Sequence, residues 1–233
     1  MDFSLFFDNE FKVIMPELYL FFVSLLLLSY GVLYSTSKEF NYPILQTNIS
    51  LFTVFSFVIT FLLLVSSPQI SISIFNNQLS LDFFGNFMKI LILLSSLSCI
   101  LISLKYLEYN KVNSFEFFIL IILATLGMFC LVSTNDFLVL YMSIELMSLS
   151  FYILAAYKRN SEFSGEAGLK YFILGAFSSG LLLFGISMIY GFTGLTNFEE
   201  LSKLLTGIHS LTDSIAYNGI LVGIFFVSVA LLF

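Results

Sequence analysis

The chain has 233 residues, of which 59% are hydrophobic and 10% are charged, with a formal net charge of −6. A soluble domain carries roughly 25% charged residues, so this composition excludes a soluble enzyme, and the shortage of Lys and Arg excludes a nucleic-acid-binding protein. We therefore expect an all-α polytopic membrane protein, with room for six or seven spans of about 20 residues each.

Seven apolar segments predict about seven transmembrane helices. We expect residues 1–14 to form an outer-side N-terminal segment and the first helix to begin at Met15-Pro16-Glu17, because proline suits the first helical turn. Helices one to four would then fall within residues 15–133, and helices five to seven within 134–233. The seven segments, in chain order, are 15–34, 43–66, 83–104, 116–133, 136–157, 167–192 and 218–233.

The connecting segments differ in character. Residues 67–82 alternate Ile and Ser around the turn signal Asn76-Asn77, so a short surface hairpin is expected there. Only Thr134 and Asn135 separate the fourth and fifth spans, which predicts a tight helical hairpin because both spans together exceed the membrane thickness. The polar residues 193–217 are expected to form a loop.

The last apolar segment, 218–233, covers only about 24 Å at 1.5 Å per residue, short of the roughly 30 Å hydrocarbon core. We therefore expect an incomplete seventh helix in a chain that is split or a fragment. Cationic residues favour one side of the membrane, and the positive-inside rule then places the N-terminus outside. The inner side would carry Lys38, Lys105, Lys111, Lys158 and Arg159, and the outer side Lys12, Lys89 and Lys203.

Glu145 is the leading candidate for chemistry, because ionisable residues inside membrane spans are costly and mark functional sites. Tyr141, Ser148 and Tyr152 share its helical face at −4, +3 and +7. Burial favours a neutral carboxyl and a nearby cation favours a carboxylate, so a carboxyl balanced between both effects can take up and release a proton. The alternative is an interhelical hydrogen bond that only fixes packing.

Two lysines lie near the ends of apolar spans. Lys170 either takes part in a proton path or snorkels to the interface, where Glu166 offers a helical ion pair four residues earlier. Lys89 is expected to snorkel to the outer interface. Asp136 suits the N-cap of the fifth helix, and His209 is expected to be solvated.

No motif for a cofactor, a metal or a nucleotide occurs in the sequence. Cys99 and Cys130 both fall in apolar runs and are expected to be packing thiols. Small residues in the sixth span, at Gly175-x-x-x-Ser179 and Ala176-x-x-x-Gly180, predict close helix contacts.

Residues 134–194 carry a family resemblance. The run that begins TNDFLVLYMSIELMSLSFYILAAYKRN and ends GISMIYGFTG closely resembles the chain 2 family of respiratory NADH:ubiquinone oxidoreductase (complex I), whose bacterial counterpart is subunit N. The Met15-Pro16-Glu17 start and Leu81-Asp82-Phe83-Phe84 fit the same family. The resemblance implies an antiporter-like subunit of about fourteen helices in two inverted repeats with broken helices, of which this chain supplies the first half.

The resemblance also implies roles for residues. Glu145 matches the essential fifth-helix glutamate and Lys170 the sixth-helix lysine, and the partner lysine of the glutamate would lie just beyond Phe233. The implied function is proton translocation coupled to NADH:ubiquinone electron transfer through a buried Glu–Lys pair. An inactive structural scaffold and a subunit of a multi-subunit sodium/proton antiporter remain alternatives.

The resemblance implies the surroundings of the chain as well. No cofactor is expected on this chain, and NADH, FMN, iron–sulfur clusters and ubiquinone would sit on other subunits. The expected partners are other membrane-arm subunits, a separate chain carrying the second half, and lipids such as cardiolipin, with no nucleic acid. The mitochondrial inner membrane is favoured, partly by the 30 Phe residues typical of an AT-rich genome, with a bacterial inner membrane as the alternative.

Overall fold

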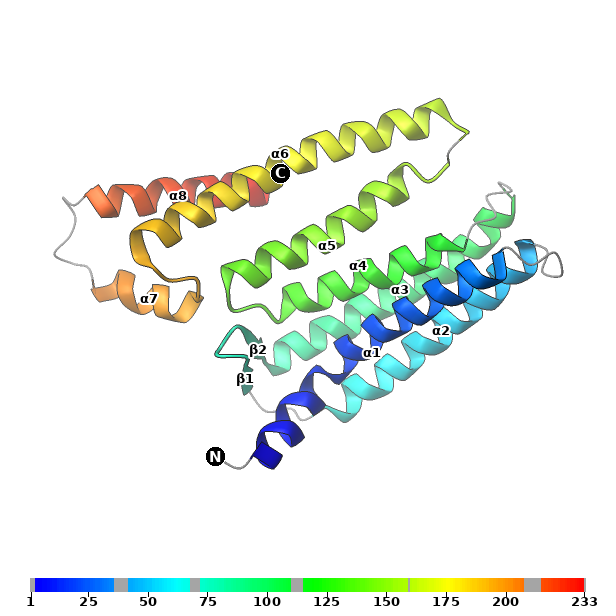
Figure 1. The fold of residues 1–233 in the computed structure, drawn as a ribbon, viewed down its shortest axis with the longest axis horizontal. Coiled ribbons are helices and arrows are strands. Elements are labelled where there is room, and N and C mark those ends of the chain that lie inside the picture. The colour runs from blue at the N-terminus through cyan, green and yellow to red at the C-terminus, as the bar shows by residue number, and fades with distance from the viewer. Residues whose placement is uncertain are drawn as a thin grey trace.

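A computed structural model describes residues 3–35, 42–67, 72–109, 115–158, 160–207 and 215–232. These residues form eight helices and one two-stranded hairpin (Figure 1). The helices are α1 (Phe3–Ser35), α2 (Tyr42–Ser66), α3 (Phe83–Tyr109), α4 (Glu116–Val132), α5 (Phe137–Ala155), α6 (Glu162–Thr193), α7 (Phe198–Gly207) and α8 (Ile215–Leu232), and the strands are β1 (Ile72–Ile74) and β2 (Leu79–Leu81).

Five helices are long and apolar enough to cross a membrane, and they confirm an all-α, multi-pass membrane protein. They are Val13–Tyr34, Leu45–Ser66, Phe83–Leu107, Phe137–Ala155 and Glu162–Thr193. Two shorter apolar helices, Glu116–Val132 and Tyr217–Leu232, fall within the other two predicted spans. The predicted helix positions agree with the structure because hydropathy alone decides which residues can be buried in lipid.

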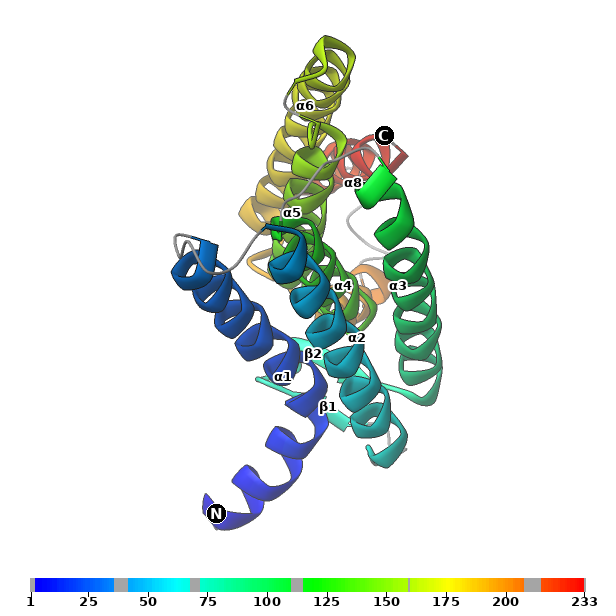
Figure 2. The ribbon, with the colours of Figure 1, turned by 90° about the vertical axis from the view of Figure 1, so that its right-hand side faces the viewer.

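The start of α1 differs from the prediction. The helix begins at Phe3, and Pro16 lies inside it. An internal proline lacks the N–H that bonds to the preceding turn, and its ring pushes against that turn, which bends the helix. Figure 2 shows α1 changing direction between its N-terminal part and the remainder. Pro16 therefore marks a kink, and most of residues 1–14 continue the helix.

The helices bury two separate hydrophobic clusters, and α5 lies between them. The first cluster is built from α1 to α4, and the second from α6, α7 and α8. Leu146 and Leu154 of α5 pack against the first cluster, whereas Leu140 and Ile144 pack against the second. Figure 1 shows the same order, with α5 between α4 and α6. The helix that carries Glu145 is thus covered on two sides by protein.

Backbone contact holds α4 close to α5. A Cβ atom added at Gly127 would lie 2.9 Å from the amide nitrogen of Met147 and 3.1 Å from the carbonyl oxygen of Ser143. The approach is possible because glycine has no side chain at that point. It places the α4 backbone directly against the turn of α5 that contains Glu145, as expected for the predicted helical hairpin.

The residues between α2 and α3 form the antiparallel pair β1–β2, in which Ile72 faces Leu81 and Ile74 faces Leu79. The turn holds Phe75, Asn76 and Asn77 at positive φ values of 53°, 51° and 66°, a conformation that asparagine tolerates better than most residues. The hairpin lies beside the start of α3 (Figure 1), within the segment where the sequence predicts one.

The turn of the hairpin joins two distant loops. The carbonyl oxygen of Asn77 accepts hydrogen bonds from Asn135 Nδ2 at 3.1 Å and from Asn197 Nδ2 at 2.7 Å. The side chain of Asn77 donates to Glu199 Oε2 at 3.0 Å. We call Asn77, Asn135 and Asn197 the asparagine junction. It fixes the α4–α5 loop and the start of α7 to the hairpin.

Asp136 caps α5, as predicted. Its Oδ1 accepts from the Leu138 amide at 2.8 Å, and its Oδ2 accepts from Thr196 Oγ1 at 2.6 Å. The second bond was not expected. It ties the first turn of α5 to the segment that follows α6. The side chain of Asp136 therefore holds this end of α5 through both of its oxygens.

The prediction of a loop over 193–217 is wrong in part, because Phe198–Gly207 form α7. Asn197 Oδ1 accepts from the backbone amides of Glu199 and Glu200, and Phe198 packs edge-on against Phe137 with ring centroids 4.7 Å apart. An asparagine cap followed by acidic residues is a signal that could have predicted this helix. His209 lies outside the described residues.

The close contacts of α6 with other helices follow the prediction in part. A Cβ added at Gly175 would run into the side chain of Tyr152 on α5, so the first predicted motif does mark a close contact. Ala176 is exposed, and a Cβ at Gly180 would meet nothing within 4 Å. A Cβ at Gly185 would instead lie 2.8 Å from the Gly223 carbonyl oxygen of α8. Helices α6 and α8 therefore pack through a pair of glycines that lies outside both predicted motifs.

We expect Gly185→Ala to separate α6 from α8, because the added methyl group meets backbone that cannot move aside. Such overpacking costs about 1–3 kcal/mol. The matched control is Gly180→Ala on the same helix, which should be neutral or slightly stabilising since alanine favours helix. Thermal melting of the purified assembly containing each variant measures both, and equal melting temperatures would contradict the packing described.

Candidate functional site

Glu145 lies in the middle of α5 and is partly buried. One of its carboxylate oxygens, Oε2, is buried and has no hydrogen-bond partner among the described residues. The two ion pairs found in that part of the chain are Lys89–Glu17 and Lys170–Glu166, and neither includes Glu145. A buried carboxyl without a donor is costly, so Glu145 has the capacity to bind a further partner.

The side chains predicted to form a polar stripe beside Glu145 make both polar and apolar contacts. Ser148 Oγ donates to the backbone carbonyl of Glu145 at 3.1 Å rather than to the carboxylate. Tyr152 is buried, and its ring stacks edge-on against Tyr171 with centroids 4.8 Å apart. Tyr141 packs against the second hydrophobic cluster. The part that these three residues play in a proton path stays a prediction.

Lys170 is on the outer surface of α6. Its Nζ lies 2.6 Å from Glu166 Oε1, and the two side chains are 68% and 60% exposed in this chain. This is the helical ion pair that the sequence offers as the alternative to a proton-path role. Within this chain the structure does not pair Lys170 with Glu145.

A second charged site, which sequence reasoning missed, lies between α1 and α3. Lys89 Nζ is 2.5 Å from Glu17 Oε1, and the side chains are 1% and 10% exposed. The prediction that Lys89 snorkels to the interface is therefore wrong, because the lysine has an anionic partner inside the bundle. We call these two residues the Glu17–Lys89 pair.

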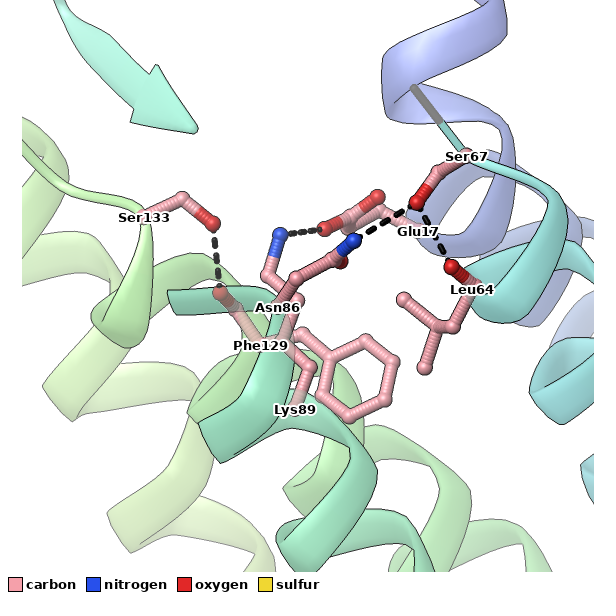
Figure 3. A network of polar contacts seen from close by, with 7 residues as sticks. All are labelled: Glu17, Leu64, Ser67, Asn86, Lys89, Phe129 and Ser133. Carbon is pink, nitrogen blue, oxygen red and sulfur yellow. Dashed lines mark hydrogen bonds and ion pairs between the residues drawn. The ribbon is translucent and has the colours of Figure 1, made fainter. Parts of the chain in front are cut away.

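Polar and apolar groups of α2, α3 and α4 surround the Glu17–Lys89 pair (Figure 3). Asn86, one turn before Lys89, donates from Nδ2 to Ser67 Oγ at 2.7 Å. Ser67 in turn donates to the Leu64 carbonyl at 2.6 Å. The other oxygen of Glu17, Oε2, is buried without a partner among the described residues. The pair therefore has, like Glu145, one buried carboxylate oxygen that accepts no hydrogen bond among the described residues.

A signal for this pair was present in the sequence. Glu17 and Lys89 both lie in the first part of an odd-numbered predicted span, and odd-numbered spans are expected to cross the membrane in the same direction. Opposite charges at equal depth in neighbouring spans attract strongly where no water screens them. Reasoning about each helix separately could not find this contact.

The described residues contain no group of three or more His, Cys, Asp or Glu that could hold a metal ion. Cys99 is exposed and Cys130 is half-buried, and both are free thiols.

Comparison with known proteins supports the resemblance. The family described as NADH:quinone oxidoreductase/Mrp antiporter, TM matches residues 134–233. Chain 2 of NADH-ubiquinone oxidoreductase from Marchantia polymorpha is 47% identical over 97% of this chain and 47% of its own length, and that from Arabidopsis thaliana is 44% identical over 97% and 45%. Subunit N of NADH-quinone oxidoreductase from Paramagnetospirillum magneticum is 40% identical over 94% and 44%.

Solved structures show the same fold. A chain of the respiratory complex I from Thermus thermophilus aligns with a TM-score of 0.64 at 23% identity, covering 89% of this chain and 42% of that one. A chain of an archaeal membrane-bound sulfane sulfur reductase aligns with a TM-score of 0.61 at 22% identity, covering 96% and 44%. The chain spans about half the length of the curated relatives it matches, and its similarity to chain 2 confirms the predicted resemblance.

We expect Lys89→Met to destabilise the protein by about 3–5 kcal/mol, because Glu17 would keep a buried charge without compensation. The double variant Glu17→Gln/Lys89→Met removes both charges and should recover most of this loss. Glu166→Gln breaks the exposed pair and should change little. Melting temperature and the amount of chain in the membrane measure all three, and a Lys89→Met variant as stable as Glu166→Gln would contradict a buried pair.

Proposed function

From its similarity to chain 2 of NADH:ubiquinone oxidoreductase, we propose that the chain is a proton-translocating membrane-arm subunit of respiratory complex I. The redox reaction and its substrates, NADH and ubiquinone, belong to the whole enzyme, with FMN and iron–sulfur clusters on other subunits. This chain contributes a path for protons across the membrane.

The observation that carries the proposal is the buried, unpartnered oxygen of Glu145 in a helix enclosed by protein on two sides. Membrane proteins keep such carboxyls where ions or protons pass. A cation brought close to Glu145 stabilises the carboxylate, and withdrawal of that cation leaves the protonated form favoured. Glu145 can therefore bind and release one proton as a neighbouring charge approaches and withdraws.

The ion pairs of the described residues leave Glu145 without a cation. By the family resemblance the cation is a lysine of the seventh, broken helix. Other membrane-arm subunits and lipids such as cardiolipin complete the surroundings. Lys170, exposed on α6, is available to a neighbouring chain as the next proton carrier.

The proposed location is the mitochondrial inner membrane, which the similarity to plant mitochondrial chain 2 supports. The proposed topology is seven spanning helices, with the N-terminus and the hairpin on the outer side.

A structural scaffold without an active channel is the second candidate. It is favoured by one observation, that Lys170 is engaged with Glu166 and that neither described ion pair includes Glu145. In this alternative Glu145 serves packing alone.

A sodium/proton antiporter subunit is a third candidate, since the matched family also includes Mrp antiporters. Co-purification with flavin and iron–sulfur proteins would exclude it.

We expect Glu145→Gln in the assembled complex to slow proton transfer through this chain by about 100-fold or more, because the amide cannot carry a proton. Protons translocated per electron pair in reconstituted vesicles are the measurement. Glu145→Asp should restore part of the activity, and Glu162→Gln, at an exposed position in the first turn of α6, should have no effect. An unchanged proton yield in an assembled Glu145→Gln complex would leave the scaffold as the function.

A further inference from the structure

We propose that the Glu17–Lys89 pair is a second proton-exchange site, which communicates with the water at the hairpin end and responds to the charge on Glu145 through α4. The inference rests on the proposed function, since it adds a proton carrier to the same chain. It assigns chemistry to α1 and α3, which the Glu145 mechanism does not use.

The first support is the incomplete bonding of the pair. Glu17 Oε1 bonds to Lys89, whereas Oε2 is buried and has no donor among the described residues. A carboxylate buried to this degree needs a donor at each oxygen to offset its lost hydration. A water molecule or a proton at Oε2 supplies that donor, so the geometry provides a place where a proton can arrive.

The second support is the direction from which a proton can reach the pair. The buried hydroxyls deeper in the bundle each donate to a carbonyl of their own helix, as in Ser24 to Phe21, Thr60 to Ser56 and Ser96 to Leu93. The side chain–side chain contact beside the pair is Asn86 to Ser67. Both residues are half-buried and lie toward the hairpin end, as Figure 3 shows. The polar side-chain contact nearest the pair is therefore on its hairpin side (Figure 3).

The third support is the place of α4 between the two acids. Its Gly127 lies against the backbone of Ser143 and Met147, on either side of Glu145. Phe129, two residues later on α4, is fully buried and lies beside Lys89 in Figure 3. The same stretch of α4 therefore adjoins both the turn of α5 that holds Glu145 and the Glu17–Lys89 pair. Charge on one acts on the other through apolar protein, where neither water nor salt screens it.

The exchange step is a simple protonation. A hydronium ion at the hairpin end transfers its proton to Glu17 Oε2 and becomes water, and the net charge of the pair rises from zero to +1. A carboxylate that appears at Glu145 favours this uptake, and reprotonation of Glu145 favours release. Lys89 holds the carboxyl in place through its contact with Oε1.

The test uses the assembled complex in vesicles and compares Glu17→Gln/Lys89→Met with Glu145→Gln. We expect the double variant to assemble, to reduce quinone, and to translocate fewer protons per electron pair, with loss of one carboxyl band from the infrared difference spectrum of turnover. An assembled double variant with the wild-type proton yield and spectrum would overturn the inference. If only Glu145→Gln lowers the yield, the proposed function stands and this inference fails.

A second variant covers failure of the double variant to assemble. Asn86→Leu leaves the pair intact but removes the polar neighbour on the hairpin side, and it should slow proton uptake several-fold and shift the pH dependence of turnover. Ser24→Ala is the matched control, because its hydroxyl bonds only within α1. Equal pH profiles for Asn86→Leu and Ser24→Ala would overturn the proposed route.

Discussion

A membrane interior offers no water to a buried charge, and this constraint explains which polar groups of the chain are paired and which are not. Lys89 and Glu17 neutralise each other inside the α1–α4 bundle. The buried hydroxyls of α2 bond to their own backbone. Glu145 and Glu17 differ from these groups, because each has one buried oxygen that accepts no hydrogen bond among the described residues.

The arrangement of helices concentrates both acids around α4. This helix has buried residues along almost its whole length and packs against α1, α3 and α5. It carries one acidic residue, Glu116 at its start, and no basic residue. Such a helix is a low-polarity medium between the two acids, which the proposed response of one acid to the charge of the other requires.

The spans could be predicted from the sequence because a run of apolar residues has few alternatives to a membrane helix. The predictions were wrong where the structure of one segment depends on its contacts with another segment. Pro16 looked like a helix start, since nothing in the sequence shows that the chain before it is also helical. Lys89 looked like a snorkelling residue, since its partner lies 72 positions away. The place of Glu145 on α5 could be predicted. That one of its oxygens has no partner among the described residues depends on three-dimensional contacts, which the sequence does not show.

The asparagine junction has a mechanical consequence. It holds the hairpin, the α4–α5 loop and the start of α7 at one end of the molecule, and Asp136 adds a bond to Thr196 there. At the opposite end, α5 and α6 are joined through a short connection in which Ser164 donates to Ala155. If α5 and α6 tilt, the bonded junction would therefore be the fixed point. The displacement would be largest at the α5–α6 connection and smaller at Glu145, which lies part-way along α5.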